Sequence, residues 1–164
     1  MQRATRQRLG WTVAVLVLLA LAAWQWRSDA NAEPGSVLDL APEQVTRIAL
    51  GIGGAPALHY EKRDGQWWQT DGTPRRADDG RLAELAATAA APVLAWRAAA
   101  DFDPARIGLA PPQAVLSLDG HTLEFGATAA TGAQRYVRVG QRIALLPERY
   151  SPRPPTGKVR DLDR

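Results

Sequence analysis

The chain of 164 residues has no cysteine, one methionine, two histidines and four serines. Without cysteine there is no disulfide framework, no thiolate metal site and no cysteine nucleophile. Lysine is also scarce, because 18 of the 20 basic residues are arginine. A chain of this length fits one compact domain rather than several.

The net charge of +3 is not spread evenly. The first 32 residues carry four arginines and one aspartate, whereas residues 33–164 carry equal numbers of acidic and basic groups. Nucleic-acid binding needs a cationic surface that releases counterions. We therefore expect no nucleic-acid partner.

One segment, residues 9–26, is uncharged over 18 residues. As a helix it would be about 27 Å long, close to the hydrocarbon thickness of a bilayer. Tryptophans at both ends suit the membrane interface, and three arginines before it favour a cytoplasmic amino terminus. The sequence therefore predicts a single-pass protein of the inner (cytoplasmic) membrane, with the rest of the chain periplasmic or otherwise extracytoplasmic. The alternative is a signal peptide cleaved after Ala32, which follows a small-x-small pattern.

Composition divides the chain into four parts. We expect a basic cytoplasmic stub and membrane anchor over residues 1–29 and a polar tether over 30–42. Residues 43–150 are expected to form the extracytoplasmic domain. Residues 151–164 are rich in proline and charge, which predicts a disordered tail.

Short runs of alternating apolar and polar residues dominate the expected domain and predict β-strands. Asp-Gly pairs between such runs are strong hairpin signals. Residues 45–50 predict one strand, and three hairpins follow: 57–70 around Asp64-Gly65, 114–125 around Asp119-Gly120, and 136–146 around Gly140-Gln141.

The pattern changes to helical spacing between the first and second hairpins. Leu82, Leu85 and Ala89 recur on one face, after an Asp78-Asp79 pair suited to cap a helix. Pro92 ends the helix, and residues 93–96 predict a short strand. Strands on both sides of one central helix predict an α+β fold with mostly antiparallel pairing.

Six short segments follow one another in a characteristic order between residues 45 and 150. They are Asp64-Gly65-Gln66-Trp67, Pro74, Ala77-Asp78 before the helix with Leu82 and Leu85, Ile107-Gly108-Leu109-Ala110-Pro111-Pro112, Phe125-Gly126, and Arg135-Tyr136-Val137-Arg138. Their order and spacing resemble the DUF4340 family, a domain of unknown function. The chain departs from that pattern at Ile107, where an aromatic residue often precedes Gly-Leu.

The resemblance implies a domain attached to a membrane by one amino-terminal helix. For some members it also implies an association with ABC-type export or gliding-motility systems. No catalytic residues are established for the family, so none is carried over to this chain.

The residues that most often carry chemistry are isolated from one another. His59 and His121 lie in predicted strands without metal-ligand spacing, and no metal or cofactor is expected. Ser117 lies on a strand and not on a nucleophile elbow. The Gly51–Gly54 run follows a strand but lacks the phosphate-loop spacing, so it predicts a plain connection.

A strand that contains Trp67 and Trp68 must point them to opposite faces of its sheet. One is therefore expected in the core. The other is either packed under the helix or a neighbouring loop, or exposed as a candidate contact for a partner or ligand. Arg75 and Arg76 are either the rim of that surface, suited to an acidic partner, or simply solvated charges.

We therefore expect a membrane-anchored extracytoplasmic interaction module without enzymatic activity, an accessory subunit of an envelope or ABC-type export complex. One alternative is an envelope glycan- or lipid-binding module that uses an exposed tryptophan. The other is a hydrolase, which requires Asp78, Asp101, Asp103 or His121 to converge in one cleft.

Overall fold

The computed structural model describes residues 35–130 and 132–154. The predicted anchor (residues 9–26), the Ala32 cleavage site and residues 155–164 of the predicted tail lie outside this part of the chain. No helix within the described part is long and apolar enough to cross a bilayer.

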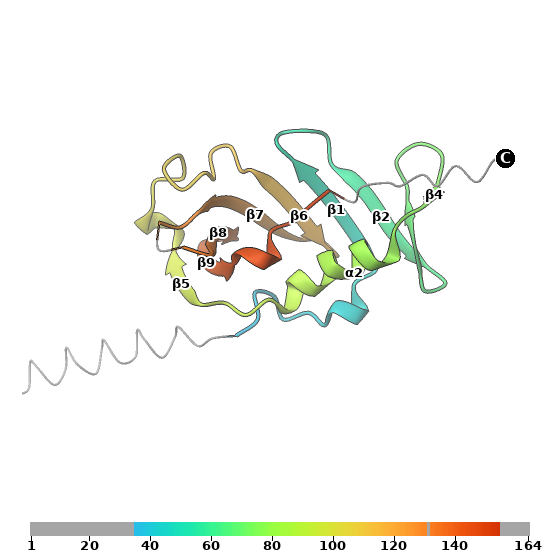
Figure 1. Ribbon diagram of the computed structural model, residues 1–164, viewed down its shortest axis with the longest axis horizontal. Coiled ribbons are helices and arrows are strands. Elements are labelled where there is room, and N and C mark those ends of the chain that lie inside the picture. The colour runs from blue at the N-terminus through green and yellow to red at the C-terminus, as the bar shows by residue number, and fades with distance from the viewer. Residues whose placement is uncertain (1–34, 131, 155–164) are drawn as a thin grey trace, which may run out of the picture. The chain divides into compact units, whose positions relative to one another are not determined.

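The described residues form a single nine-stranded sheet with one α-helix against it (Figure 1). The strand order is β4-β3-β2-β1-β6-β7-β8-β9-β5, and every neighbouring pair is antiparallel. The strands are β1 (Arg47–Ile52), β2 (Leu58–Arg63), β3 (Gln66–Gln69), β4 (Arg75–Arg76), β5 (Ala95–Ala98), β6 (Ala114–Leu118), β7 (His121–Thr128), β8 (Gln134–Val139) and β9 (Arg142–Pro147).

The predicted α+β class is wrong, because the described residues form mostly one antiparallel sheet and the single α-helix is short. The two groups of predicted strands do not stand apart on either side of a helix. Instead β1 pairs directly with β6, for example Ala49 with Ser117, so both groups belong to one continuous sheet. The short strand predicted over residues 93–96 is present, shifted by two residues, as the edge strand β5.

The helix α2 (Asp79–Ala87) begins where the Asp78-Asp79 pair predicts. The Asp78 side chain accepts the backbone N–H of Arg81 at 3.1 Å, which is an N-cap hydrogen bond. Beyond α2 the backbone tightens into the 3₁₀ helix η2 (Thr88–Ala90), and Pro92 then pairs with Ser36 in an isolated bridge. Three further 3₁₀ helices are η1 (Pro42–Gln44), η3 (Ala99–Asp101) and η4 (Glu148–Tyr150).

The three predicted hairpin turns are present. Asp64 and Asp119 both have positive φ angles and are followed by glycines with positive φ, as two-residue hairpin turns require. Asp64 and its glycine join β2 to β3, and Asp119 and its glycine join β6 to β7. These positions depend on local backbone chemistry, which explains why the sequence predicts them.

The main core lies between the sheet and α2. Alternate residues of the strands point to this side, including Ile48, Leu116 and Phe125, each 2% exposed or less. Leu82 and Leu85 of α2 pack against them. Val37 and Leu38 also join this core, so the fold begins earlier than the predicted boundary at residue 43.

Among the described residues, a loop covers the opposite face of the sheet over the end of β7 and over β8 and β9. Ile107 and Leu109, from the loop between β5 and β6, form a second apolar cluster with Ile143, and Tyr136 packs against it. Phe102 meets Tyr136 edge to face, with ring centroids 5.6 Å apart. This loop leaves the same face of β1, β2 and β6 uncovered.

Candidate functional site

Trp67 and Trp68 point to opposite faces of β3. Trp67 is 3% exposed, packs in the main core, and has the Lys62 ammonium 5.8 Å from its ring centroid. Its backbone N–H donates to the carboxylate of Asp79 at 2.7 Å. Trp68 lies on the outer face, away from α2, and is half-buried.

The strand register aligns four side chains of the outer face in one row. Arg47 is opposite Glu61, Glu61 is opposite Trp68, and Trp68 is opposite Arg76. The Arg76 guanidinium lies 5.7 Å from the Trp68 ring centroid and donates to Asp79 at 2.8 Å. This guanidinium therefore covers part of the indole that the sequence predicts as a contact surface.

Arg75 does not join this row. Its neighbour in the register is Gln69, a residue of the core face, and its Nε donates to Gln69 Oε1 at 2.8 Å. Of the four predicted surface residues, the structure brings together Trp68 and Arg76, and it places Trp67 and Arg75 on the other side of the sheet.

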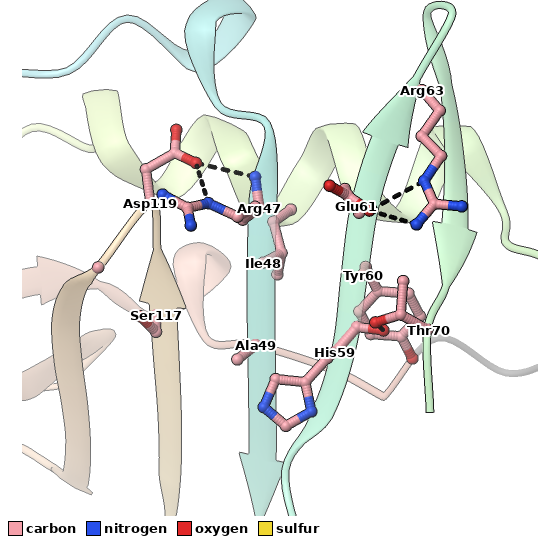
Figure 2. A pocket seen from close by; sticks show the side chains of 11 residues that line it. Arg47, Ile48, Ala49, His59, Tyr60, Glu61, Arg63, Thr70, Ser117 and Asp119 are labelled. Atoms are coloured by element: carbon pink, nitrogen blue, oxygen red, sulfur yellow. Dashed lines mark hydrogen bonds and ion pairs between the residues drawn. The ribbon is translucent and has the colours of Figure 1, made fainter. Parts of the chain in front are cut away.

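A shallow hollow of about 490 Å³ lies on the uncovered part of the outer face, beside this row. Figure 2 shows the side chains that line it, which come from β1, β2 and β6, from the turn after β6, and from Thr70 just after β3. Ala49 and Ser117 are opposite each other in the strand register, and their small side chains form the base of the hollow. We call the surface made by Arg47, Ala49, His59, Glu61, Trp68 and Ser117 the open face.

The charges around the open face are paired within the protein. Arg47 lies 3.8 Å from Asp119, and Glu61 accepts two hydrogen bonds from Arg63, the shorter at 2.6 Å. Asp119 also accepts the backbone N–H of Arg47 at 2.8 Å. Exposed pairs of this kind contribute little stability, but they fix an alternating pattern of positive and negative groups on the surface.

His59 on β2 is held by Asp71. The Asp71 carboxylate accepts the His59 backbone N–H at 2.6 Å and lies 2.8 Å from the ring Nδ1. The pKa of Asp71 is lowered, first by that backbone hydrogen bond and then by the imidazole. The imidazole orientation is therefore determined through Nδ1.

A His–Asp pair near a serine raises the question of a hydrolase. In the register, however, His59 is opposite Ala49, and Ala49 is opposite Ser117. Two strand spacings of roughly 4.8 Å each separate histidine from serine, which is well beyond hydrogen-bond reach. Ser117 and His59 thus share the hollow without forming a nucleophile and base.

The predicted hydrolase residues are also dispersed. Asp78 caps α2, whereas Asp101 ends η3 beyond the opposite edge strand β5. Asp103 accepts the backbone N–H of Ala105 at 3.0 Å, as a turn residue does, and His121 begins β7. Within residues 35–130 and 132–154 no three histidine, cysteine or carboxylate side chains are grouped as metal ligands.

The Gly51–Gly54 run is a connection between strands. Gly51 and Ile52 complete β1, and the positive φ angles of Gly53 and Gly54 turn the chain toward β2. No helix follows that would direct its amino terminus at a phosphate.

Most of the open face is missed by reasoning from the sequence. Arg47, Glu61 and Ser117 carry no motif, and Ala49 is an unremarkable strand residue. They form one surface only because β1 pairs with β6, a strand more than sixty residues away along the chain. The alternation of β1 places Arg47 and Ala49 on the polar side of the strand, which is the one signal that points to them.

Comparisons with known proteins give no match to a family model, to a curated protein or to a solved structure. The resemblance to the DUF4340 family stays a hypothesis that rests on the segments quoted above.

Proposed function

We propose that this chain is an interaction module that binds a partner protein through the open face. The observation that carries the proposal is the uneven covering of the sheet. The outer face of β8 and β9 is covered by Ile107 and Leu109, whereas within the described part of the chain the outer face of β1, β2 and β6 is uncovered and hollowed. Arg47 and His59 side chains there are 73% and 58% exposed.

The character of the open face suits a protein partner. Its charges alternate in sign, and electrostatic complementarity to such a pattern gives specificity and register in protein association. A half-buried tryptophan and arginines are residue types enriched at the centres of interfaces. A flat glycan platform is less well supported, because Trp67 is in the core and Arg76 lies over Trp68.

The membrane part of the proposal rests on the sequence. Residues 9–26 would anchor the chain in the cytoplasmic membrane, and the basic residues before them would keep the amino terminus inside. The open face would then be presented outside the membrane. The partner would be an envelope protein, and the DUF4340 resemblance suggests a component of an ABC-type export system.

Site-specific photocrosslinking in cells tests the proposal. A photoreactive amino acid replaces Ser117 on the open face or, as the matched control, Ala83, which is exposed on α2. The full chain carries a carboxyl-terminal tag and is recovered from detergent-solubilised membranes after irradiation. We expect one protein adduct of defined mass from the Ser117 position, absent from the Ala83 position and lost when Glu61→Arg is added.

Two outcomes contradict different parts of the proposal. Equal adducts at both positions, or none at Ser117, would contradict partner binding through the open face. A protein that is trimmed after Ala32 and recovered outside the membrane would contradict the anchor alone.

A further inference from the structure

A second hollow, of about 340 Å³, lies between α2 and the end of the described chain. Three arginines line it: Arg81 from α2, Arg149 from η4, and Arg153 just beyond η4. Figure 1 shows η4 lying alongside α2, so arginines from two segments distant in the sequence meet in one place. This hollow is separate from the open face.

Among residues 35–130 and 132–154, a carboxylate neutralises one of these three charges. Glu84 is the single carboxylate in the lining, and it accepts a hydrogen bond from Arg81 at 3.0 Å. Within the part of the chain that the structure describes, neither Arg149 nor Arg153 lies within ion-pair distance of a carboxylate. Counted over the described residues, the hollow therefore carries an excess of positive charge.

The nearest acidic residue in sequence is already engaged elsewhere. Glu148 precedes Arg149, but its carboxylate accepts a hydrogen bond from Arg135 at 2.6 Å. It also accepts hydrogen bonds from Thr128 and Ser151, each at 3.2 Å. These contacts, the Arg135 hydrogen bond first, lower the pKa of Glu148, so its carboxylate stays charged and is paired with Arg135 of β8.

The walls of the hollow are suited to orient arginine. The Arg149 guanidinium lies 5.0 Å from the Tyr150 ring centroid, which restricts where its N–H groups point. Leu85 is 5% exposed and is an apolar part of the lining. Guanidinium groups bind phosphate oxygens through paired hydrogen bonds, and a concave surface of one sign concentrates anions.

We propose that this hollow binds a phosphate group, held by Arg149 and Arg153, with Arg81 as a third donor when it leaves Glu84. Its volume is at the lower end of small-molecule sites, which suits a phosphate with a small organic group attached.

Binding is measured on the purified full chain in zwitterionic detergent, by isothermal titration calorimetry. One arm adds inorganic phosphate, and the other adds dioctanoyl phosphatidylglycerol, a lipid phosphodiester. We expect saturable binding of at least one of the two and, for the double variant Arg149→Gln/Arg153→Gln, an affinity lower by roughly tenfold or more. The control Arg97→Gln/Arg106→Gln removes the same charge from exposed positions outside the hollow and should leave the affinity within about twofold.

A third variant tests the role of Glu84. Glu84→Gln frees Arg81 and removes the one negative group in the lining, so phosphate should bind several-fold more tightly, as expected for charge-assisted hydrogen bonds.

Binding of phosphatidylglycerol alone identifies a lipid as the source of the phosphate group, and binding of inorganic phosphate alone identifies a soluble source. The absence of binding in both arms, or equal losses in the two double variants, would overturn the proposal.

Discussion

The carboxylate of Asp79 accepts the backbone N–H of Trp67 at 2.7 Å, which joins the first turn of α2 to β3. The same carboxylate accepts a hydrogen bond from Arg76 at 2.8 Å. The helix is thus attached to the sheet by one acidic side chain near its positively polarised end. The hydrogen bond from the Trp67 backbone is the main cause of the lowered pKa of Asp79.

Replacing this carboxylate should destabilise the fold in a pH-dependent way. Asp79→Ala should lower the free energy of unfolding at pH 7 by about 1–2 kcal/mol, a modest value because the side chain is 45% exposed. A lowered pKa means that the stabilisation is present above the unfolded-state pKa of about 3.9 and is lost as the pH falls through the folded-state value.

Urea denaturation of the wild type and Asp79→Ala at pH 7, 5 and 3 measures this difference. The difference in free energy of unfolding between the two proteins should be largest at pH 7 and smaller at pH 3. The matched control, Asp39→Asn, changes an exposed carboxyl and should unfold like the wild type. If the difference in free energy of unfolding stayed constant down to pH 3, Asp79 would stabilise the fold without its charge.

The two adjacent tryptophans should differ in what they contribute to stability. Trp67→Ala removes a core ring and should cost roughly 3–5 kcal/mol. Trp68→Ala removes a half-buried ring on the outer face and should cost about 1 kcal/mol. Chemical denaturation of both variants compares the free energies of unfolding, and similar losses would contradict the assignment of Trp67 alone to the core.

Gly126 should not tolerate a side chain. A Cβ at this position would overlap the carbonyl oxygen of Ile107, which accepts the N–H of Ala127 at 2.7 Å. Gly126→Ala should therefore push the covering loop away from the sheet and cost about 1–3 kcal/mol. Gly51→Ala is the control, because a Cβ there meets its nearest atom at an ordinary 3.4 Å. Equal stability of both variants would show that the loop adjusts freely.

Alkaline pH should weaken the fold through Tyr60. Burial is the main cause of its raised pKa, and the nearby Asp71 charge adds to it. The folded state therefore keeps the phenol neutral, and stability is full below the unfolded-state pKa of about 10 and declines as the pH rises through the folded-state value. Tyr60→Phe should reduce this decline between pH 9 and 11.5 in urea denaturation, whereas Tyr150→Phe should not.

Some of the predictions from the sequence concern short-range structure, and these agree with the structure. The Asp-Gly turns at residues 64 and 119 and the Asp78 cap are found where expected. Each depends on interactions among three or four consecutive residues. The alternation of Trp67 and Trp68 is equally local, since neighbours in a strand always point to opposite faces.

The fold class and most of the candidate site could not be predicted in the same way. The pairing of β1 with β6 decides that all strands belong to one sheet, and it also places Ala49 beside Ser117. Residues of β1 carry no local signal for that partner, because any strand with similar alternation satisfies the same hydrogen bonds. The second hollow likewise needs η4 to pack near α2 before Arg81 and Arg149 can meet.

The sequence by itself thus determined the turns, the helix cap, the faces of individual strands and the expectation of an anchor over residues 9–26. Only the tertiary structure decided which strands are neighbours, which part of the outer face Ile107 and Leu109 cover, and which arginines meet in the second hollow. The reason is physical: local preferences act over a few residues, whereas these contacts depend on burying apolar surface shared by segments far apart in the chain.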